Sequence, residues 1–226
     1  MEPIPRIKYK SFRAVFLAIS TVTIALLLPP RALLSATKEH RLLPAEVQAP
    51  VQSSIRDLEG KSNVIPDPDS EVTVIVFLDT ECPISNGFIP EINRIFENYK
   101  DKGIYFLVAY PDPGLKTEAA INHGKRYGIK VRSAIDQDQS LAKSCGVTMT
   151  PEAVVLLADG EVAYRGRIDD RYTELGKSQK KVEDRELRNA LGDLLNGDLV
   201  AVSRTNAVGC YLREIVPPPA AAGDKK

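Results

Sequence analysis

Residues 72–86 read VTVIVFLDTECPISN, and this stretch decides the fold of the chain. Its first seven residues are apolar and largely β-branched, a pattern typical of a buried strand. Cys82 follows this run, with Pro83 beside it and a segment of helical spacing behind. The free N–H groups of a helix N-terminus create a positive field, which lowers the pKa of a thiol and favours the reactive thiolate. Cys82 is therefore a candidate nucleophile; the alternative is an inert, buried cysteine.

Strand and helix patterns alternate along the rest of the chain. Apolar residues at helical spacing mark 86–100, which contains Pro90, and the Asp159-Gly160 pair marks a tight hairpin. The alternation, closed by this hairpin and a last helix, predicts an α/β fold with a central mixed sheet and helices on both faces. The expected elements are a hairpin around 55–61, strands at 72–78, 104–109, 134–135, 153–157 and 161–165, and helices at 86–100, 117–127, 140–144 and 182–195.

Composition limits the class of partner. The chain has 226 residues, no net formal charge, 27% charged and 43% hydrophobic residues, which suits one globular domain with tails. A neutral balance argues against nucleic acid as a partner, because binding to phosphates needs a basic surplus. The cysteines are not spaced as CxxC, and His40 and His123 are far apart, so we expect no metal and no cofactor.

The N-terminus has the pattern of an export signal. Basic residues at 6–13 precede an apolar stretch at 14–28, which is about the length of a signal-peptide core and short for a membrane span. We expect residues 1–36 to be a signal peptide or an uncleaved anchor, followed by a linker at 37–43. The chain is then exported to a periplasmic or other extracytoplasmic compartment where disulfides persist. If the leader is uncleaved, 14–28 tether the chain to the inner membrane.

The order of these features resembles the thioredoxin fold, specifically the redoxin (AhpC/TSA-like) domains of exported bacterial proteins. Cys82 follows the first long strand, Pro90 comes eight residues later, and Thr150-Pro151 stands just before the strand at 153–157. The resemblance spans 44–197 and implies a three-layer thioredoxin-like fold. It also implies that Thr150-Pro151 is a cis bond beside the catalytic sulfur, where an extended substrate docks; an ordinary trans turn is the alternative.

The remaining residues, 198–226, form a C-terminal tail that carries Cys210. The sequence departs from the thioredoxin motif because Cys82-Pro83-Ile84-Ser85 is CxxS, and the Ser85 hydroxyl cannot release a mixed disulfide. Resolution then comes from another cysteine, from an external thiol, or not at all. Cys210 is the better internal candidate, because its tail is able to fold back; otherwise it is a free surface thiol. Cys145 lies after a short helix and is expected to pack in the core.

Several neighbours are candidates for supporting roles. Pro83 fixes a helical φ at the first helical position. The carboxylate of Glu81, like that of Asp79, either raises the pKa of the nearby thiol, relays a proton, or points into water. Thr80 and Ser85 complete the polar surroundings of the cysteine.

Three functions fit this pattern. The first is an exported thiol–disulfide oxidoreductase that acts through Cys82 on protein or small-molecule thiols or disulfides, with an external thiol as reductant. The second is a peroxiredoxin-like thiol peroxidase, an antioxidant, in which Cys82 becomes a sulfenic acid that Cys210 or an outside thiol captures. Arg165 and Arg167 would share a strand face and stabilise the thiolate, unless they form an exposed strand end. That family places a threonine where Asp79 stands here. The third is a non-enzymatic docking module with a structural Cys82–Cys210 disulfide.

Overall fold

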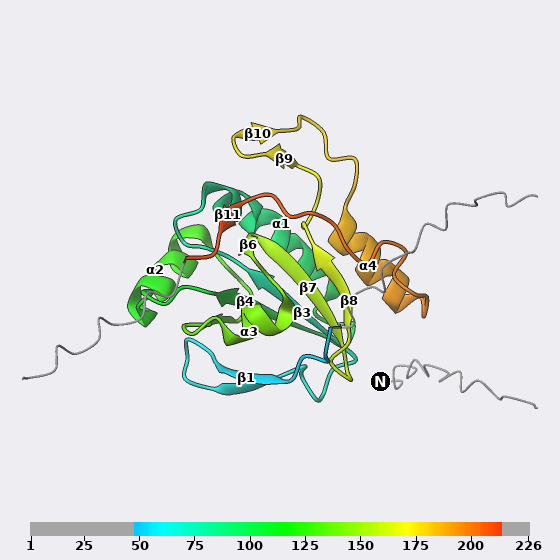
Figure 1. Cartoon of the computed structure of the whole chain (residues 1–226), viewed down its shortest axis with the longest axis horizontal. Coiled ribbons are helices and arrows are strands. Elements are labelled where there is room, and N and C mark those ends of the chain that lie inside the picture. The colour runs from blue at the N-terminus through cyan, green and yellow to red at the C-terminus, as the bar shows by residue number, and fades with distance from the viewer. Residues whose placement is uncertain (1–47, 214–226) are drawn as a thin grey trace, which may run out of the picture. The chain divides into compact units, whose positions relative to one another are not determined.

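The computed structural model describes residues 48–213, which fold around a five-stranded mixed sheet (Figure 1). The strand order is β5-β4-β3-β7-β8, with β3, β4 and β5 parallel and β7 and β8 antiparallel to their neighbours. The predicted thioredoxin-like fold with a central mixed sheet is confirmed. The strands are β3 (Val72–Phe77), β4 (Ile104–Tyr110), β5 (Ser133–Ile135), β7 (Glu152–Leu157) and β8 (Val162–Gly166).

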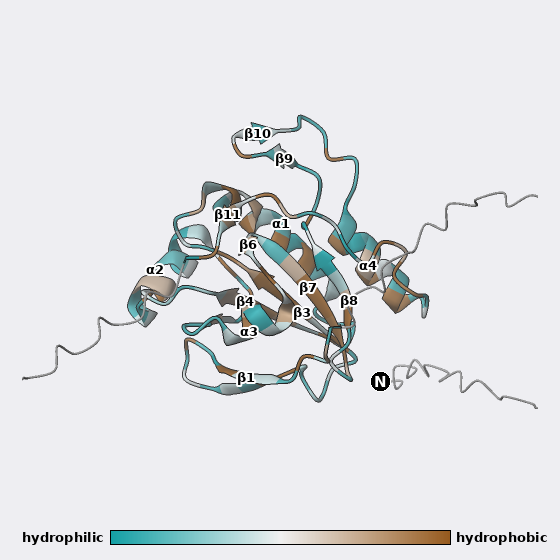
Figure 2. Cartoon of the chain, viewed as in Figure 1, coloured by the Kyte–Doolittle hydropathy of each residue, from teal (hydrophilic) through white to brown (hydrophobic). Residues whose placement is uncertain are grey.

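Both faces of the sheet are covered, so the apolar runs of the sequence are buried on two sides. One core lies between the sheet and the helices α1 (Pro83–Tyr99), α2 (Thr117–Tyr127) and α4 (Glu186–Leu195). The other core lies under α3 (Ser140–Cys145) and the hairpin of β1 (Ser53–Arg56) and β2 (Ser62–Ile65). Along β7, Ala153 and Val155 join the first core, whereas Val154 and Leu156 join the second. Figure 2 shows the hydrophobic colouring of these central strands.

The starts of two helices can be compared with the predictions. Helix α1 starts at Pro83, the expected first helical position, three residues before the apolar repeat that begins at residue 86, and it continues through Pro90 without a break. Helix α4 starts at Glu186 rather than at residue 182. The backbone N–H of Glu183 donates instead to the Asp170 carboxylate, 3.0 Å from Oδ1, so this stretch satisfies its amides outside the helix.

The segment 198–213, which we call the C-terminal segment, passes the edge strand β8, where Arg204 forms an isolated bridge with Arg165, and then forms a separate two-stranded sheet with β6 (Met149–Thr150). Within it, β11 (Cys210–Tyr211) pairs antiparallel with β6. A separate hairpin joins β9 (Tyr172–Glu174) and β10 (Lys177–Ser178).

The predicted leader at 1–36 and the linker at 37–43 lie outside the described residues, as does the tail from residue 214. Between residues 48 and 213, no helix is long and apolar enough to cross a membrane.

Candidate functional site

Cys82 occupies the N-cap position of α1, in extended conformation, and Pro83 is the first helical residue. The cysteine carbonyl accepts the Asn86 N–H at 3.0 Å, while its side chain makes no capping bond. This leaves the sulfur at the positive end of a 17-residue helix. The residue is nevertheless only 2% exposed. Cys82 therefore lies at the helix N-terminus, as predicted, and is also buried.

The peptide bond between Thr150 and Pro151 is cis, as the resemblance implies. Its carbonyl side faces the cysteine: the Cys82 Sγ lies 3.6 Å from the Thr150 carbonyl oxygen. The bond between Ile65 and Pro66 is also cis, which the sequence pattern did not predict. The helix N-terminus and the cis bond, 68 residues apart, thus meet at one sulfur.

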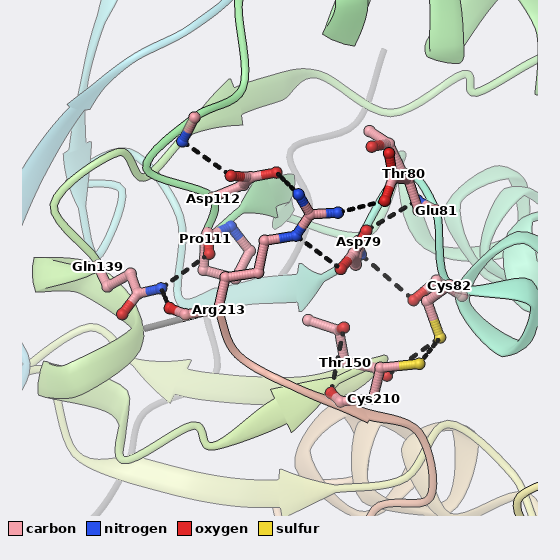
Figure 3. A network of polar contacts seen from close by, with 12 residues as sticks. Asp79, Thr80, Glu81, Cys82, Pro111, Asp112, Gln139, Thr150, Cys210 and Arg213 are labelled. Atoms are coloured by element: carbon pink, nitrogen blue, oxygen red, sulfur yellow. Dashed lines mark hydrogen bonds and ion pairs between the residues drawn. The ribbon is translucent and has the colours of Figure 1, made fainter. Parts of the chain in front are cut away.

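The C-terminal segment supplies a second sulfur to this point. Both cysteines are free thiols, and the Cys210 Sγ lies 3.0 Å from the Cys82 Sγ (Figure 3). Cys210 is opposite Thr150 in the β11–β6 pairing, and the Thr150 hydroxyl donates to the Cys210 carbonyl at 3.5 Å. Burial raises the pKa of Cys210 to about 11, and the hydrogen bond to Cys82 and the negative charges of Cys82 and Asp79 act in the same direction. Cys210 therefore keeps its proton at neutral pH.

Gly209 explains how the two strands approach so closely. A Cβ atom built on this residue would lie 1.9 Å from the Thr150 carbonyl oxygen and 3.0 Å from Pro151 Cδ. Any larger residue would therefore push the segment away from β6. The pair Gly209-Cys210 is the local sequence signal for this contact.

Arg213 holds the end of the C-terminal segment through charged contacts that the sequence reasoning missed. Its guanidinium lies 2.5 Å from Glu81 Oε2, 3.7 Å from Asp112 Oδ2 and 3.8 Å from Asp79 Oδ2 (Figure 3). Its carbonyl accepts from Gln139 Nε2 at 2.6 Å. Asp79 and Asp112 follow the neighbouring parallel strands β3 and β4. The carboxyl ends of these strands lie at the same end of the sheet, so two acidic residues directly after two predicted strands were the sequence signal for their proximity.

The other predicted supporting residues shape the loop before the helix. Ser85 is fully buried, and its hydroxyl accepts the Asp79 N–H at 3.3 Å. The Thr80 carbonyl accepts from Asn86 Nδ2 at 3.2 Å, and Asn86 Oδ1 contacts His123 Nε2 at 2.8 Å. Burial lowers the pKa of His123, so this imidazole acts as a neutral link between α2 and α1.

Arg165 lies with Cys145 rather than with Cys82. Its Nη1 donates to the Cys145 carbonyl at 3.0 Å, and its Nε lies 3.4 Å from Glu152 Oε1. Cys145 belongs to the second core, on the opposite sheet face from the Cys82 core, because strand side chains alternate between faces. The prediction that Arg165 supports the nucleophile is not matched by these contacts.

Two buried groups on that face have strongly shifted pKa values. Burial raises the pKa of Cys145 to about 12, which fits its predicted packing role. Burial also raises the pKa of Glu152 to about 7, against the opposing effects of the Thr148 N–H and the Arg204 charge. Glu152 was not singled out from the sequence. Among residues 48–213, no group of three or more His, Cys, Asp or Glu side chains is placed to hold a metal ion.

Comparison with known proteins identifies the class of this domain. The Redoxin family model matches residues 48–184, and the chain belongs to this family. The match contains Cys82 and the cis bond and ends before Cys210.

Curated relatives carry a more specific name. The "Thiol-disulfide oxidoreductase ResA" of Bacillus thuringiensis subsp. konkukian is 27% identical over 57% of this chain and 73% of the relative. That of Halalkalibacterium halodurans is 23% identical over 53% of this chain and 68% of the relative.

Solved structures confirm the fold. A hypothetical protein, SMc02350, from Sinorhizobium meliloti has a TM-score of 0.66 at 21% identity, covering 74% of this chain and 93% of that one. An uncharacterized conserved protein from Geobacillus kaustophilus has a TM-score of 0.65 at 21% identity, covering 76% and 94%.

Proposed function

We propose that this chain is an exported thiol–disulfide oxidoreductase in which Cys82 is the nucleophile and Cys210 is the resolving thiol. The observation that carries the proposal is the meeting of two thiols, 3.0 Å apart, at the N-terminus of α1 and beside the cis bond at Thr150-Pro151. Membership of the Redoxin family and relatives named thiol-disulfide oxidoreductases support it. Ser85 leaves the helix without a resolving thiol, and the C-terminal segment supplies one.

The reaction follows from thiol–disulfide exchange. The Cys82 thiolate attacks one sulfur of a substrate disulfide; that bond breaks, and the other substrate sulfur leaves as a thiolate and takes up a proton. The Cys210 sulfur attacks Cys82 Sγ in the mixed disulfide, the bond between Cys82 and the substrate sulfur breaks, and the Cys210 proton passes to that leaving sulfur. The second substrate thiol leaves, and a Cys82–Cys210 disulfide remains. The substrate gains two electrons, which an external thiol reductant returns to the protein.

The C-terminal segment therefore belongs to the working unit. The redoxin domain expected at 44–197 lacks the second sulfur, so we include residues up to 213. Thr150-Pro151 provides the edge on which a substrate docks once β11 moves away. Export through the leader at 1–36 suits this chemistry, because a Cys82–Cys210 disulfide persists in an oxidising compartment.

The peroxidase alternative gains no support from the described contacts. That hypothesis uses an arginine to stabilise the thiolate, but Arg165 contacts Glu152 and the Cys145 carbonyl. Arg167 pairs with Glu186. The thiol–disulfide reaction needs no such cation at the sulfur.

A single-turnover experiment tests the proposal. The reduced full chain is mixed with a model peptide disulfide, quenched with acid, alkylated and analysed by mass spectrometry. We expect the natural chain to release both peptide thiols and form Cys82–Cys210. Cys210→Ser should stop at a mixed disulfide on Cys82, and Cys145→Ala should match the natural chain. Reduction of the peptide by Cys82→Ser at the natural rate would refute the proposal.

A further inference from the structure

The residues 209–213 lie along the short strand β6 as an extended peptide lies beside an unpaired strand. Cys210 and Tyr211 pair antiparallel with Thr150 and Met149, and the Leu212 N–H donates to the Thr148 carbonyl at 3.1 Å. Edge strands pair in this way with peptides from other chains, where backbone bonds give affinity and side-chain contacts give specificity. The segment is therefore a built-in example of what this edge accepts.

Each position of the segment meets a different requirement. Position 209 must lack a side chain, because a Cβ would lie 1.9 Å from the Thr150 carbonyl oxygen. Position 210 brings a sulfur to Cys82. Tyr211 is 77% exposed and is free to vary, whereas Leu212 packs against the second hydrophobic core.

The surroundings of position 213 favour a positively charged side chain. The guanidinium of Arg213 is the cation among three carboxylates: Asp79, whose side chain is 15% exposed, Asp112, at 11%, and Glu81, at 77%. One positive charge against three negative ones leaves a local excess of negative charge. The Asp79 and Asp112 carboxylates are largely buried, and interactions between charges are stronger there than at an open surface. A neutral or acidic residue here would leave them without this partner.

We infer that this edge selects partner segments of the pattern glycine–cysteine–any–apolar–basic, with the basic residue three positions after the reacting cysteine. The inference rests on the proposed function and specifies its substrate class. The C-terminal segment occupies the site in the reduced chain, and a partner segment takes its place in the same register. Asp79, Glu81 and Asp112 are specificity determinants in this view, because they contact the docked segment and not the reacting sulfurs.

Activated peptides test this selection directly. Peptides of sequence Gly-Cys-Tyr-Leu-Arg, and the same with Ala or Glu last, carry the cysteine as a mixed disulfide with 2-nitro-5-thiobenzoate. The Cys82 thiolate attacks the peptide sulfur, the disulfide breaks, and the coloured thiolate leaves, so absorbance reports the rate. The protein is the full chain with Cys210→Ser, which removes the internal thiol, with and without Gly209→Ala, which weakens the internal occupant. Rates with glutathione in place of protein correct for the intrinsic reactivity of each peptide.

We expect the corrected rate for the Arg peptide to exceed that for the Glu peptide at least fivefold at low salt, and the ratio to shrink as salt screens the charges. Adding Glu81→Gln and Asp112→Asn should lower the ratio at least twofold, because Asp79 is then the remaining carboxylate of the three. Equal corrected rates for the three peptides, or an unchanged ratio in the carboxylate variant, would overturn the inference while leaving the nucleophile in place. A failure of every peptide to release the coloured thiolate would overturn the proposed function, and this selection with it.

Discussion

Gly209→Ala is the sharpest test of how the two sulfurs meet. The added Cβ would lie 1.9 Å from the Thr150 carbonyl oxygen and 2.5 Å from its carbonyl carbon, and real Cβ contacts essentially never fall below 3.0 Å. Because these neighbours are backbone atoms beside a paired strand, the C-terminal segment must move, by about 1 Å or more. Cys210 follows Gly209 directly, so its sulfur moves with it.

The magnitude follows from what the movement breaks. The bonds from the Thr150 hydroxyl to the Cys210 carbonyl, at 3.5 Å, and from the Leu212 N–H to the Thr148 carbonyl, at 3.1 Å, both depend on this approach. At about 1 kcal/mol each, their loss costs about 2 kcal/mol, or roughly a 30-fold change in the docked population. A displacement of about 1 Å between reacting groups costs up to about 100-fold in rate by itself. We expect disulfide closure to slow by on the order of 30-fold or more.

The assay separates closure from the first attack. The reduced full chain is mixed with oxidised glutathione, acid-quenched at intervals, alkylated and analysed by mass spectrometry. Cys82 attacks glutathione disulfide and releases one glutathione, and Cys210 then displaces the other. The natural chain should pass quickly to the internal disulfide, while Gly209→Ala should accumulate glutathione on Cys82.

A matched glycine variant controls for general effects of the added methyl group. Gly192 lies inside α4 with no atom within 4 Å of a built Cβ. Gly192→Ala should raise the free energy of unfolding by about 0.5–1 kcal/mol and leave closure unchanged. If Gly209→Ala closes its disulfide within about twofold of the natural rate, the close approach at Thr150 does not position the sulfur, and the reasoning is wrong.

Three further outcomes are expected. Cys145, fully buried and with a pKa raised to about 12, should resist maleimide in the folded chain and react only after denaturation; prompt labelling would contradict its packing role. Burial raises the pKa of Glu152 from 4.5 to about 7, so between these pH values the folded chain binds more protons than the unfolded chain. The free energy of unfolding should therefore fall as the pH rises from 4.5 to 7, by roughly 3 kcal/mol at most. Urea titrations should show Glu152→Gln lacking much of this slope, and an unchanged slope would assign it to other groups. Arg213→Ala should speed alkylation of Cys82 about two- to fivefold, since partly exposed ion pairs contribute about 0.2–1 kcal/mol each; an unchanged rate would show that this contact does not hold the segment.

The sequence predicted the frame of the fold because its signals are local. The β-branched run of β3 and the Asp159-Gly160 turn each report on a few neighbouring residues, and the structure places them as expected. The apolar repeat of α1 begins only at residue 86, but Pro83 marks the start of the helix, and the structure begins it there. The start of α4 was placed early because the Asp170 carboxylate, which binds the Glu183 amide, is distant in sequence.

The candidate site was only partly predictable for the same reason. Cys82 and the cis bond each carry a proline signal in the sequence. The position of the Cys210 sulfur depends on the pairing of Cys210 with Thr150, which is 60 residues away in the sequence. The contact between Arg213 and Glu81 joins residues 132 positions apart. The sequence named Cys210 as a partner for Cys82, but neither its register with Thr150 nor the Arg213 contact leaves a periodic or compositional trace. Gly209, read as a site of close backbone approach, was the available clue.

The pairing of β11 with β6 also has a consequence for behaviour in concentrated solution. When β11 departs, a short unpaired strand edge and a reactive sulfur become accessible at the same moment, and unpaired edges invite association between molecules. When two opened molecules meet there, oxidised glutathione can take up the two electrons as their Cys82 thiols join in an intermolecular disulfide. Crosslinked dimers should thus accumulate with protein concentration in variants that release the segment, and the intact chain should stay single.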